Sequence, residues 1–265
     1  MIVAGLLLLA IGAVDLIRRF APRPWIGYFV GVVLLLAVGL CSASLLPAII
    51  AVVLAAGWLM SMPLAGRAPA SFWPVVVVAV LCVGAVAFMP ARTDAGLLGD
   101  VWRVPSPLGP VPFDVAVLTV GVVAFLLESG NLIVRVALGT ESSSPRASGE
   151  SPEASVGSAL SDESVPSMPS ENEPSAVREV SPHDVFKGGR LIGPLERVLV
   201  FLLTITGAYP VLAAVIAAKG IVRFPEISRD GEKGARAEYF LVGSLVSWAI
   251  AFGGAVLVWW GFASR

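Results

Sequence analysis

The stretch FDVAVLTVGVVAFLLESGNLIVRVALG (113–139) combines the apolar length of a membrane-spanning helix with polar residues at regular spacing. Four residues recur at every seventh position and a fifth falls between the last two: Asp114, Gly121, Glu128, Arg135 and Asn131. On a helix of 3.6 residues per turn, these five residues share one narrow face. Because an unpaired charge inside a span costs about 2.5–3.5 kcal/mol, that face is expected to point into a helix bundle.

This polar face has two interpretations, and the sequence leaves both open. In the first, a buried ion pair and hydrogen bonds fix the packing of the helices. In the second, the face lines a path for an ion or a ligand, which is the common role of ionisable residues inside membranes. The second interpretation makes Glu128, Asn131 and Arg135 candidate ligand-binding residues.

The composition of the whole chain is that of a membrane protein. Hydrophobic residues make up 57% of the 265 residues and charged residues 14%, with a mean hydropathy of +0.87. A soluble domain carries roughly 25% charged residues. The apolar residues fall in long runs with few charges, which predicts an all-α bundle with about six membrane spans.

Cysteine and histidine usage argues against a metal site. Cys41 and Cys82 both lie in apolar runs, where free thiols pack as small hydrophobic side chains. His183 is the only histidine in the sequence. A histidine-based metal site therefore has little support, and no cofactor is expected.

Five spans are expected in the N-terminal transmembrane region, 1–139. The basic cluster RRFAPR (18–23) follows the first apolar run, and such clusters stay in the cytoplasm, so the N-terminus is predicted outside. One helix over 25–60 would measure about 54 Å against a hydrocarbon core of roughly 30 Å, so two spans with a turn near 44–47 are expected. The predicted spans are 1–17, two within 25–60, 72–89 and 113–139.

Ser, Pro and Glu dominate the segment 140–182, which has no aromatic residue. Such a composition cannot bury enough apolar surface to offset its ordering entropy, so a disordered acidic linker is predicted. With the acidic residues concentrated here, the rest of the chain is net positive, as suits segments that border anionic lipid headgroups. The linker is expected on the cytoplasmic side.

The C-terminal membrane cassette, 183–265, contains an apolar run at 195–220 that is interrupted by GAYP (207–210). If this run crossed the membrane once, the basic segment 219–236 would lie outside, against the positive-inside preference. A re-entrant hairpin that turns at 207–210 keeps both basic flanks cytoplasmic and is the favoured interpretation. A single proline-kinked span is the alternative.

Charged residues gather around this predicted hairpin. Arginine forks suit phosphate or carboxylate groups, so one interpretation is a cytoplasm-facing site for an anionic lipid headgroup or solute. In the other, the basic side chains merely reach anionic lipid, each contributing about 1 kcal/mol. The candidate residues are Arg190, Glu196, Arg197, Lys219, Arg223, Glu226 and Glu238.

The last predicted span, 239–262, carries small residues along one face. These residues are Gly243, Ser247, Ala251 and Gly254. A stripe of this kind lets membrane helices approach closely, and it predicts helix–helix association between copies of the chain.

Three pieces of the cassette, GGRLIGPLER (188–197), AAKGIVRFPEI (217–227) and AEYFLVGS (237–244), resemble the C-terminal signature of a family of uncharacterised bacterial integral membrane proteins. The segment ESGNLIVR (128–135) is similar to that family's preceding span. The resemblance implies a multi-pass fold in a bacterial inner membrane. It implies no reaction.

The motifs of common enzyme classes are missing from the sequence. It has no phosphate-binding loop, no HExxH and no supported GxSxG. The segment DGEKGAR (230–236) is similar to the metal-binding motif of CDP-alcohol phosphotransferases, but its spacing is one residue too long and no acid follows Glu238. That metal site is therefore excluded, and nucleic-acid binding has no support beyond basic loops.

Two functional hypotheses from different classes remain. The first is a transporter- or channel-like protein with a cytoplasm-facing polar site for an anionic solute or ion. The second is a non-transporting membrane scaffold or anionic-lipid-binding module. An enzyme that acts on phospholipid is a third possibility, for which no catalytic constellation is visible.

Overall fold

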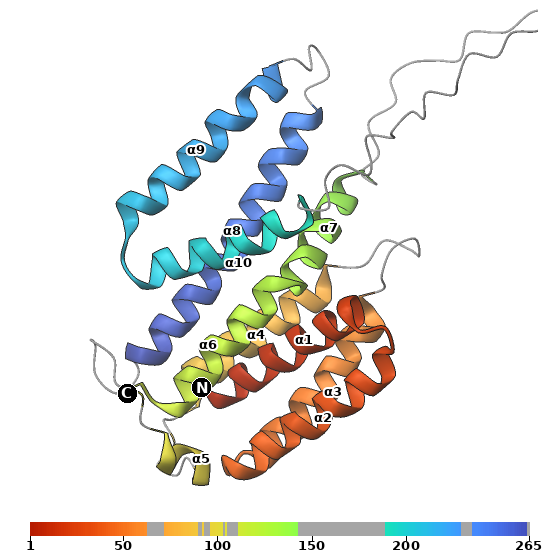
Figure 1. Ribbon diagram of the computed structural model, residues 1–265, viewed down its shortest axis with the longest axis vertical. Coiled ribbons are helices and arrows are strands. Elements are labelled where there is room, and N and C mark those ends of the chain that lie inside the picture. Colours follow the sequence, from red (N-terminus) through yellow and green to blue (C-terminus); the bar gives the residue numbers. More distant parts are fainter. Residues whose placement is uncertain are drawn as a thin grey trace, which may run out of the picture.

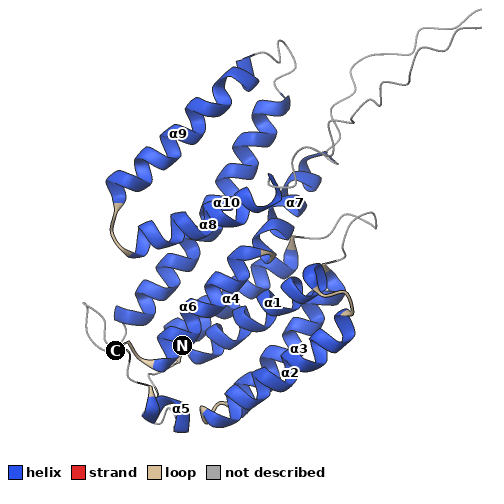
Figure 2. Ribbon diagram, viewed as in Figure 1, coloured by secondary structure: helices blue, strands red, loops and turns tan. Residues whose placement is uncertain are grey.

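The computed structural model describes residues 1–62, 72–89, 92, 96–102, 104, 111–142, 189–228 and 235–263. Within these ranges, side chains are described except at 140–142, 189–190, 223–228, 235–237 and 239. The described residues form helices joined by loops, without a β-strand (Figure 2). The helices are α1 (Ile2–Phe20), α2 (Pro24–Cys41), α3 (Leu45–Ser61), α4 (Trp73–Phe88), α5 (Gly96–Val101), α6 (Phe113–Leu127), α7 (Ser129–Ser142), α8 (Gly189–Ile205), α9 (Tyr209–Ser228) and α10 (Ala235–Ala263). The predicted all-α fold is confirmed.

The long apolar stretch 25–60 is divided between α2 and α3, as its length required. The turn between them lies at 42–44, where Ala43 has a φ of 50°. Pro47, which was expected at the turn, lies in the first turn of α3 instead. A proline is tolerated there because the N–H groups of the first turn have no partner within the helix.

The stretch 113–139 does not form one straight helix. It is divided into α6 and α7, whose axes differ in direction by 47°. Glu128 lies at the break with φ −127° and ψ −43°, so the backbone leaves the helical region at this residue. The expectation of one continuous span is therefore corrected to two helices with a sharp bend.

The helices α1 and α6 form the centre of the bundle and run in the same direction (Figure 1). Their backbones approach closely because glycines face the partner helix. A Cβ atom on Gly5 would lie 2.8 Å from the Leu118 nitrogen, and one on Gly12 would lie 2.5 Å from the Ala124 carbonyl carbon. Gly121, a member of the predicted polar face, lies against the Gly5 carbonyl oxygen. Small residues of this kind allow tight helix packing in membranes.

The C-terminal helices pack on the other side of α6 and α7 (Figure 1). The helix α10 runs antiparallel to α6–α7, because Gly243 lies near Leu138 while Gly261 lies near Leu118. The start of α1 and the end of α10 consequently lie at the same end of the bundle (Figure 1). In the chain order, α8 and α9 follow α7 and precede α10. They form a helical hairpin with its turn at 206–208, where Gly207 has a φ of +70°.

The small residues of α10 pack inside the chain's own bundle. Ser247 and Ala251 are buried, and a Cβ atom on Gly254 would meet the side chains of Val122 and Phe201. Gly243 faces α7. Association of copies through this face stays a prediction, and it would have to compete with these contacts.

Two described helices are long and apolar enough to cross a membrane, Pro24–Cys41 in α2 and Phe240–Ala263 in α10. The bent pair α6–α7 makes a third if its two parts act as one span. The six predicted spans are therefore not supported, since α3 and α4 have only 17 and 16 residues and α1 contains an aspartate and two arginines. Together with the large apolar side chains that α2 and α10 expose, these helices indicate a membrane protein.

The predicted linker, 140–182, begins within α7, which extends to Ser142. The remainder of the linker lies outside the described residues, so its predicted disorder stays a prediction.

Candidate functional site

The bend between α6 and α7 is filled by side chains that bind its free carbonyl groups. The last carbonyls of a helix have no partner within the helix. At this bend the Leu126 carbonyl accepts a hydrogen bond of 2.9 Å from Arg197 Nε. The Leu127 carbonyl accepts one of 3.4 Å from Asn131 Nδ2. The side chains thus supply the donors that a straight helix would have supplied from its backbone.

Arg197 reaches the bend from α8 and is 2% exposed. Besides the Leu126 carbonyl, its guanidinium binds the Asn131 Oδ1 atom and lies 3.4 Å from Ser247 Oγ on α10. Gly130 leaves the space for this side chain, because a Cβ atom there would lie 2.8 Å from Arg197 Nε. One guanidinium therefore connects α8 with the bend and with α10.

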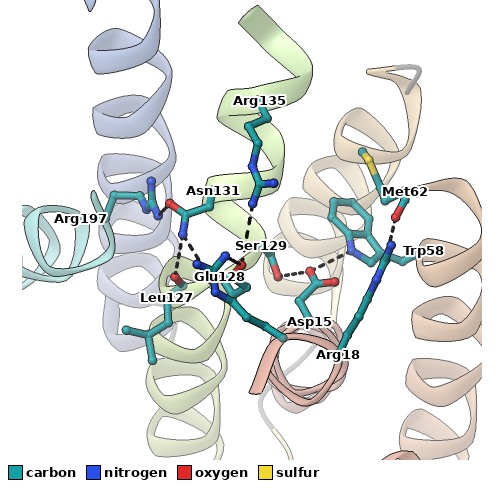
Figure 3. Close-up of polar contacts among 11 residues, drawn as sticks. Asp15, Arg18, Trp58, Met62, Leu127, Glu128, Ser129, Asn131, Arg135 and Arg197 are labelled. Atoms are coloured by element: carbon teal, nitrogen blue, oxygen red, sulfur yellow. Dashed lines mark hydrogen bonds and ion pairs between the residues drawn. The ribbon is translucent and has the colours of Figure 1, made fainter. Parts of the chain in front are cut away.

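Asp15 makes a second connection, on the opposite side of the bend (Figure 3). Its Oδ2 atom accepts hydrogen bonds of 2.6 Å from Ser129 Oγ and 3.1 Å from Trp58 Nε1. These three residues lie on α1, α7 and α3, and Asp15 is 5% exposed. The carboxylate consequently joins three helices at the depth of the break.

Glu128, the residue at the break, is held by charged and polar neighbours. Its Oε1 atom forms an ion pair with Arg19 Nη1 and lies 4.0 Å from Arg135 Nη2. Its Oε2 atom accepts a hydrogen bond of 3.3 Å from Asn131 Nδ2. Both carboxylate oxygens therefore face donors, which offsets the cost of burying the charge.

A separate polar cluster fastens the helical hairpin to α10. Lys219 Nζ on α9 binds both carboxylate oxygens of Glu196 on α8, at 2.6 and 2.7 Å. Trp248 Nε1 on α10 donates to the same carboxylate at 2.8 Å. The ammonium also lies 5.3 Å from the centre of the Trp248 ring and 5.7 Å from that of Phe240, within the range of cation–π attraction.

The structure brings only part of the predicted site together. Glu128, Asn131, Arg135 and Arg197 meet at the bend, whereas Glu196 and Lys219 form the separate cluster near α10. Glu238 is exposed, and the side chains of the remaining candidates lie outside the described residues. Those candidates are Arg190, Arg223 and Glu226.

Asp114, the first member of the predicted polar face, does not join the others. It lies at the far end of α6, where Arg92 Nη2 binds its Oδ1 atom at 2.6 Å. The same guanidinium donates to the Ser42 carbonyl at 2.7 Å and to the Ser44 hydroxyl. This ion pair holds the turn between α2 and α3 against the start of α6.

Sequence reasoning missed several residues of the bend. Asp15 was visible as the one acid in its apolar run, but nothing near it indicated its partners Ser129 and Trp58. The arginines of α1 were interpreted as topology signals only. The missed residues of the bend are Asp15, Arg18, Arg19, Trp58, Ser129 and Ser247, and in the separate cluster Trp248 was missed.

Two hollows differ sharply in character. A small one of about 10 Å³ lies beside Glu128 and Arg135 among charged residues and Leu132, with room for roughly one water molecule. A much larger one of about 380 Å³ is an open groove between α4, α6 and α10, lined by apolar side chains. The groove includes Phe72, Val75, Ala79 and Val83 from the α4 side, and it follows α10 from Val246 to Leu257.

The polar groups of the bend are satisfied within the chain. Among the described residues, no buried side-chain nitrogen or oxygen lacks a hydrogen-bond partner. The same residues contain no group of three His, Cys, Asp or Glu side chains that could hold a metal ion. The arrangement is suited to hold helices together and to keep charges neutralised.

Comparison of the chain with protein-family models, with curated proteins and with solved structures finds no match. The resemblance of the C-terminal cassette to a bacterial membrane-protein family therefore stays a prediction.

Replacing Arg197 tests its role at the bend. Arg197→Ala would leave the Leu126 carbonyl and the Asn131 amide without a donor, at about 1–3 kcal/mol for each buried group. We expect a clear fall in the midpoint of thermal unfolding in detergent. Arg197→Lys should recover only part of the loss, because an ammonium cannot reproduce the planar fork. An unchanged midpoint for Arg197→Ala would show that the bend does not depend on this residue.

A matched pair of glycine variants separates this role from a general effect on α7. Gly130→Ala should lower the midpoint as well, because its methyl group would displace the Arg197 guanidinium. Gly139→Ala on the same helix meets nothing within 4 Å, so it should leave the midpoint unchanged or raise it, since Ala favours helix over Gly.

Proposed function

We propose that the protein is a non-transporting membrane module that binds lipid, with a hydrocarbon chain in the groove between α4 and α10. The observation that carries the proposal is the groove itself. Its volume of about 380 Å³ falls in the range of roughly 300–1,000 Å³ that is typical of small-molecule sites. Its lining is apolar along its whole length.

The position of the groove favours a lipid chain as its occupant. It follows Val246 to Leu257 of α10, within the segment Phe240–Ala263 that is long and apolar enough to cross a membrane. At that depth the surrounding medium consists of hydrocarbon chains. A chain lying in the groove would restore the contacts that the walls of an empty groove lack.

The charges at the bend support a role other than transport. Glu128 and Asp15 have partners within the chain, and the hollow beside Glu128 has room for about one water molecule. A solute that crossed here would have to replace these contacts. The ion pairs and hydrogen bonds act in this proposal as a scaffold for the groove.

Filling the groove tests the proposal. Gly253 lines the groove, and an added side chain there would extend into open space. Gly253→Phe should displace about two methylene groups of a bound chain, at about 0.8 kcal/mol each, and so lower lipid retention roughly tenfold. Native mass spectrometry of the purified chain would count the lipids that stay bound.

Gly84→Phe is the matched control. Gly84 lies on α4, also has open space around it and is not part of the groove lining. It should leave lipid retention unchanged. Equal retention by wild type and Gly253→Phe would rule out the groove as the lipid site.

We also propose a topology in which α1, α2, α3, α4, the α6–α7 pair and α10 all cross the bacterial inner membrane. The shorter helices would be accommodated by local thinning of the bilayer. Arg18, Arg19 and Arg135 lie at one end of the bundle, which the positive-inside rule places in the cytoplasm with the linker. The two chain ends would then lie outside.

In this topology the hairpin of α8 and α9 enters from the cytoplasmic side and returns to it. Phe201 of α8 lies against Gly254, about 21 Å along α10 from Phe240. The turn at 206–208 would therefore lie inside the bilayer, where its backbone N–H groups stay bonded to carbonyl groups of α8.

Cysteine labelling tests this topology. Single cysteines at Ser142 and Ser228, in a chain whose Cys41 and Cys82 are replaced by Ala, should react with an impermeant reagent from the same side of the membrane. Labelling from opposite sides would make the hairpin a crossing segment and overturn the proposed orientation.

A second candidate function is transport of an anionic solute or ion, which the bent α6–α7 pair favours. Broken helices beside polar residues form the binding sites of many transporters, and Glu128 lies at the break. This function predicts flux through purified protein in liposomes and a changed rate in Glu128→Gln. Liposomes that stay tight to a panel of ions and anionic solutes would exclude it and leave the lipid-binding proposal intact.

A further inference from the structure

A second apolar pocket lies between α1, α2 and α3, apart from the groove. Its walls are formed by side chains from 10–17 of α1, 28–35 of α2 and 52–59 of α3, and it is called the Tyr28 pocket below. Its volume is about 180 Å³. An apolar cavity of about 150 Å³ stays dry and binds a small apolar molecule. The Tyr28 pocket therefore has room for part of a hydrocarbon chain.

Close contacts of α2 limit the pocket at both ends. Near the start of α2, a Cβ atom on Gly27 would lie 2.4 Å from Ile17 Cγ2 on α1. Near its end, a Cβ atom on Gly39 would lie 2.5 Å from the Ala48 Cβ atom on α3. Between these contacts the pocket follows 28–35 of α2, about 10 Å along the helix axis. The pocket thus ends within the bundle and does not reach the turn at 42–44.

The pocket is open on the side of Ala56. This residue lines the pocket and is also exposed, so an occupant can enter beside it from outside the bundle. The adjoining segment Pro24–Cys41 of α2 is long and apolar enough to cross a membrane. The medium outside the opening is then hydrocarbon.

Among the described residues that line the pocket, only Tyr28 has a polar side chain. The residue is half-buried, and its hydroxyl makes no hydrogen bond with the part of the chain that the structure describes. A tyrosine hydroxyl among apolar groups usually has a hydrogen-bond partner. An occupant that carries an acceptor at its head would supply this partner.

Charge near Tyr28 favours an oxygen acceptor over a cation. Arg18 is the charged group that acts most strongly on the Tyr28 hydroxyl, and Asp15 acts less strongly. The Asp15 carboxylate is already bound within the chain. Arg18 donates to the Met62 carbonyl, a neutral group, so that contact does not cancel its positive charge. A carbonyl or carboxylate oxygen beside Tyr28 would therefore be attracted by Arg18.

We propose that the Tyr28 pocket binds an acyl group. The hydrocarbon chain packs against α1 and α3, and the carbonyl or carboxylate oxygen at its head accepts a hydrogen bond from the Tyr28 hydroxyl. The acyl group belongs either to a free fatty acid or to a phospholipid, since both present the same chain and oxygen. A plain hydrocarbon would fill the pocket but leave the hydroxyl without a partner.

This site goes beyond the proposed function and does not require it. The Tyr28 pocket and the groove between α4 and α10 share no lining residue. Failure of the groove variant Gly253→Phe to lose lipid would therefore leave the acyl site untouched, and the reverse also holds.

Ligand-dependent stabilisation tests the site, since a ligand that binds only the folded chain raises the unfolding midpoint. In the first arm, the purified full chain in dodecyl maltoside is titrated with sodium decanoate. Decyltrimethylammonium, which has the same chain but no acceptor, is the comparison. We expect decanoate to stabilise the chain more than decyltrimethylammonium does. Equal stabilisation by the two would show that the pocket recognises only the chain and would overturn the acyl site.

In the second arm, the chain is placed in nanodiscs of an ester-linked phosphatidylglycerol or of its ether-linked counterpart, which has no acyl carbonyl. A higher midpoint in the ester-linked lipid, lost in Tyr28→Phe, identifies a phospholipid as the source of the acyl group. Stabilisation by decanoate in the first arm identifies a free fatty acid. Absence of stabilisation in both arms would overturn the site.

Two variants test the residues of the pocket. Tyr28→Phe should raise the decanoate concentration for half-maximal stabilisation about five-fold, because it removes one hydrogen bond. Its ligand-free midpoint should be unchanged, because the described residues make no hydrogen bond with this hydroxyl. Ala56→Phe should raise the concentration at least about tenfold, because its ring would occupy the space of the chain.

Ala37→Phe is the matched control for Ala56→Phe. Ala37 is an exposed alanine of α2 that does not line the pocket. It should leave the half-maximal concentration of decanoate unchanged. Equal losses in Ala37→Phe and Ala56→Phe would mean that decanoate adsorbs on the outer surface of the helices, and would contradict the proposal.

Discussion

The fold depends on one guanidinium that enters a break in a helix. Arg197 binds the Leu126 carbonyl at the point where α6 ends, and it also binds Asn131 at the start of α7. Burial of an arginine in an apolar bundle is costly unless acceptors surround the guanidinium. The bend supplies these acceptors, and the guanidinium in turn supplies the donors that the bend lacks. The two features stabilise each other, and neither is expected to persist alone.

This interaction also connects two parts of the chain that are far apart in sequence. Arg197 belongs to α8, whereas α6 and α7, which meet at the bend that it fills, precede the segment 143–188. Its neighbour Glu196 binds Lys219 and Trp248, so consecutive residues of α8 bind α6–α7 on one side and α9 and α10 on the other. The position of α8 is consequently fixed by polar bonds to every helix around it. The hairpin that α8 begins is fastened at its base by the same residues.

The sequence was sufficient for the helical elements but not for the bend or its partners. Apolar runs and turn residues located α2, α3 and the hairpin turn near Gly207, because those signals are local. The seven-residue spacing of Gly121 and Glu128 also placed the inward face correctly as far as the break. It assumed a straight helix, however, and so could not predict that Asp114 binds Arg92 at the far end. The bond from Ser129 to Asp15 joins residues more than a hundred positions apart, and no local pattern carries that information.

Helices in hydrocarbon gain little from burying apolar surface against each other, so close backbone packing and polar bonds must hold them together. Both kinds of contact are found around α1. Gly5 and Gly12 allow the backbone of α6 to pack closely, and Asp15 accepts hydrogen bonds from α3 and α7. The groove between α4 and α10 has no polar bond across it, because its lining is apolar and its walls stand apart. Hydrocarbon chains can occupy such a gap without breaking any bond of the bundle. The polar centre and the apolar groove therefore follow from the same constraint, in that the helices meet tightly where polar bonds hold them and stand apart at the groove, which has none.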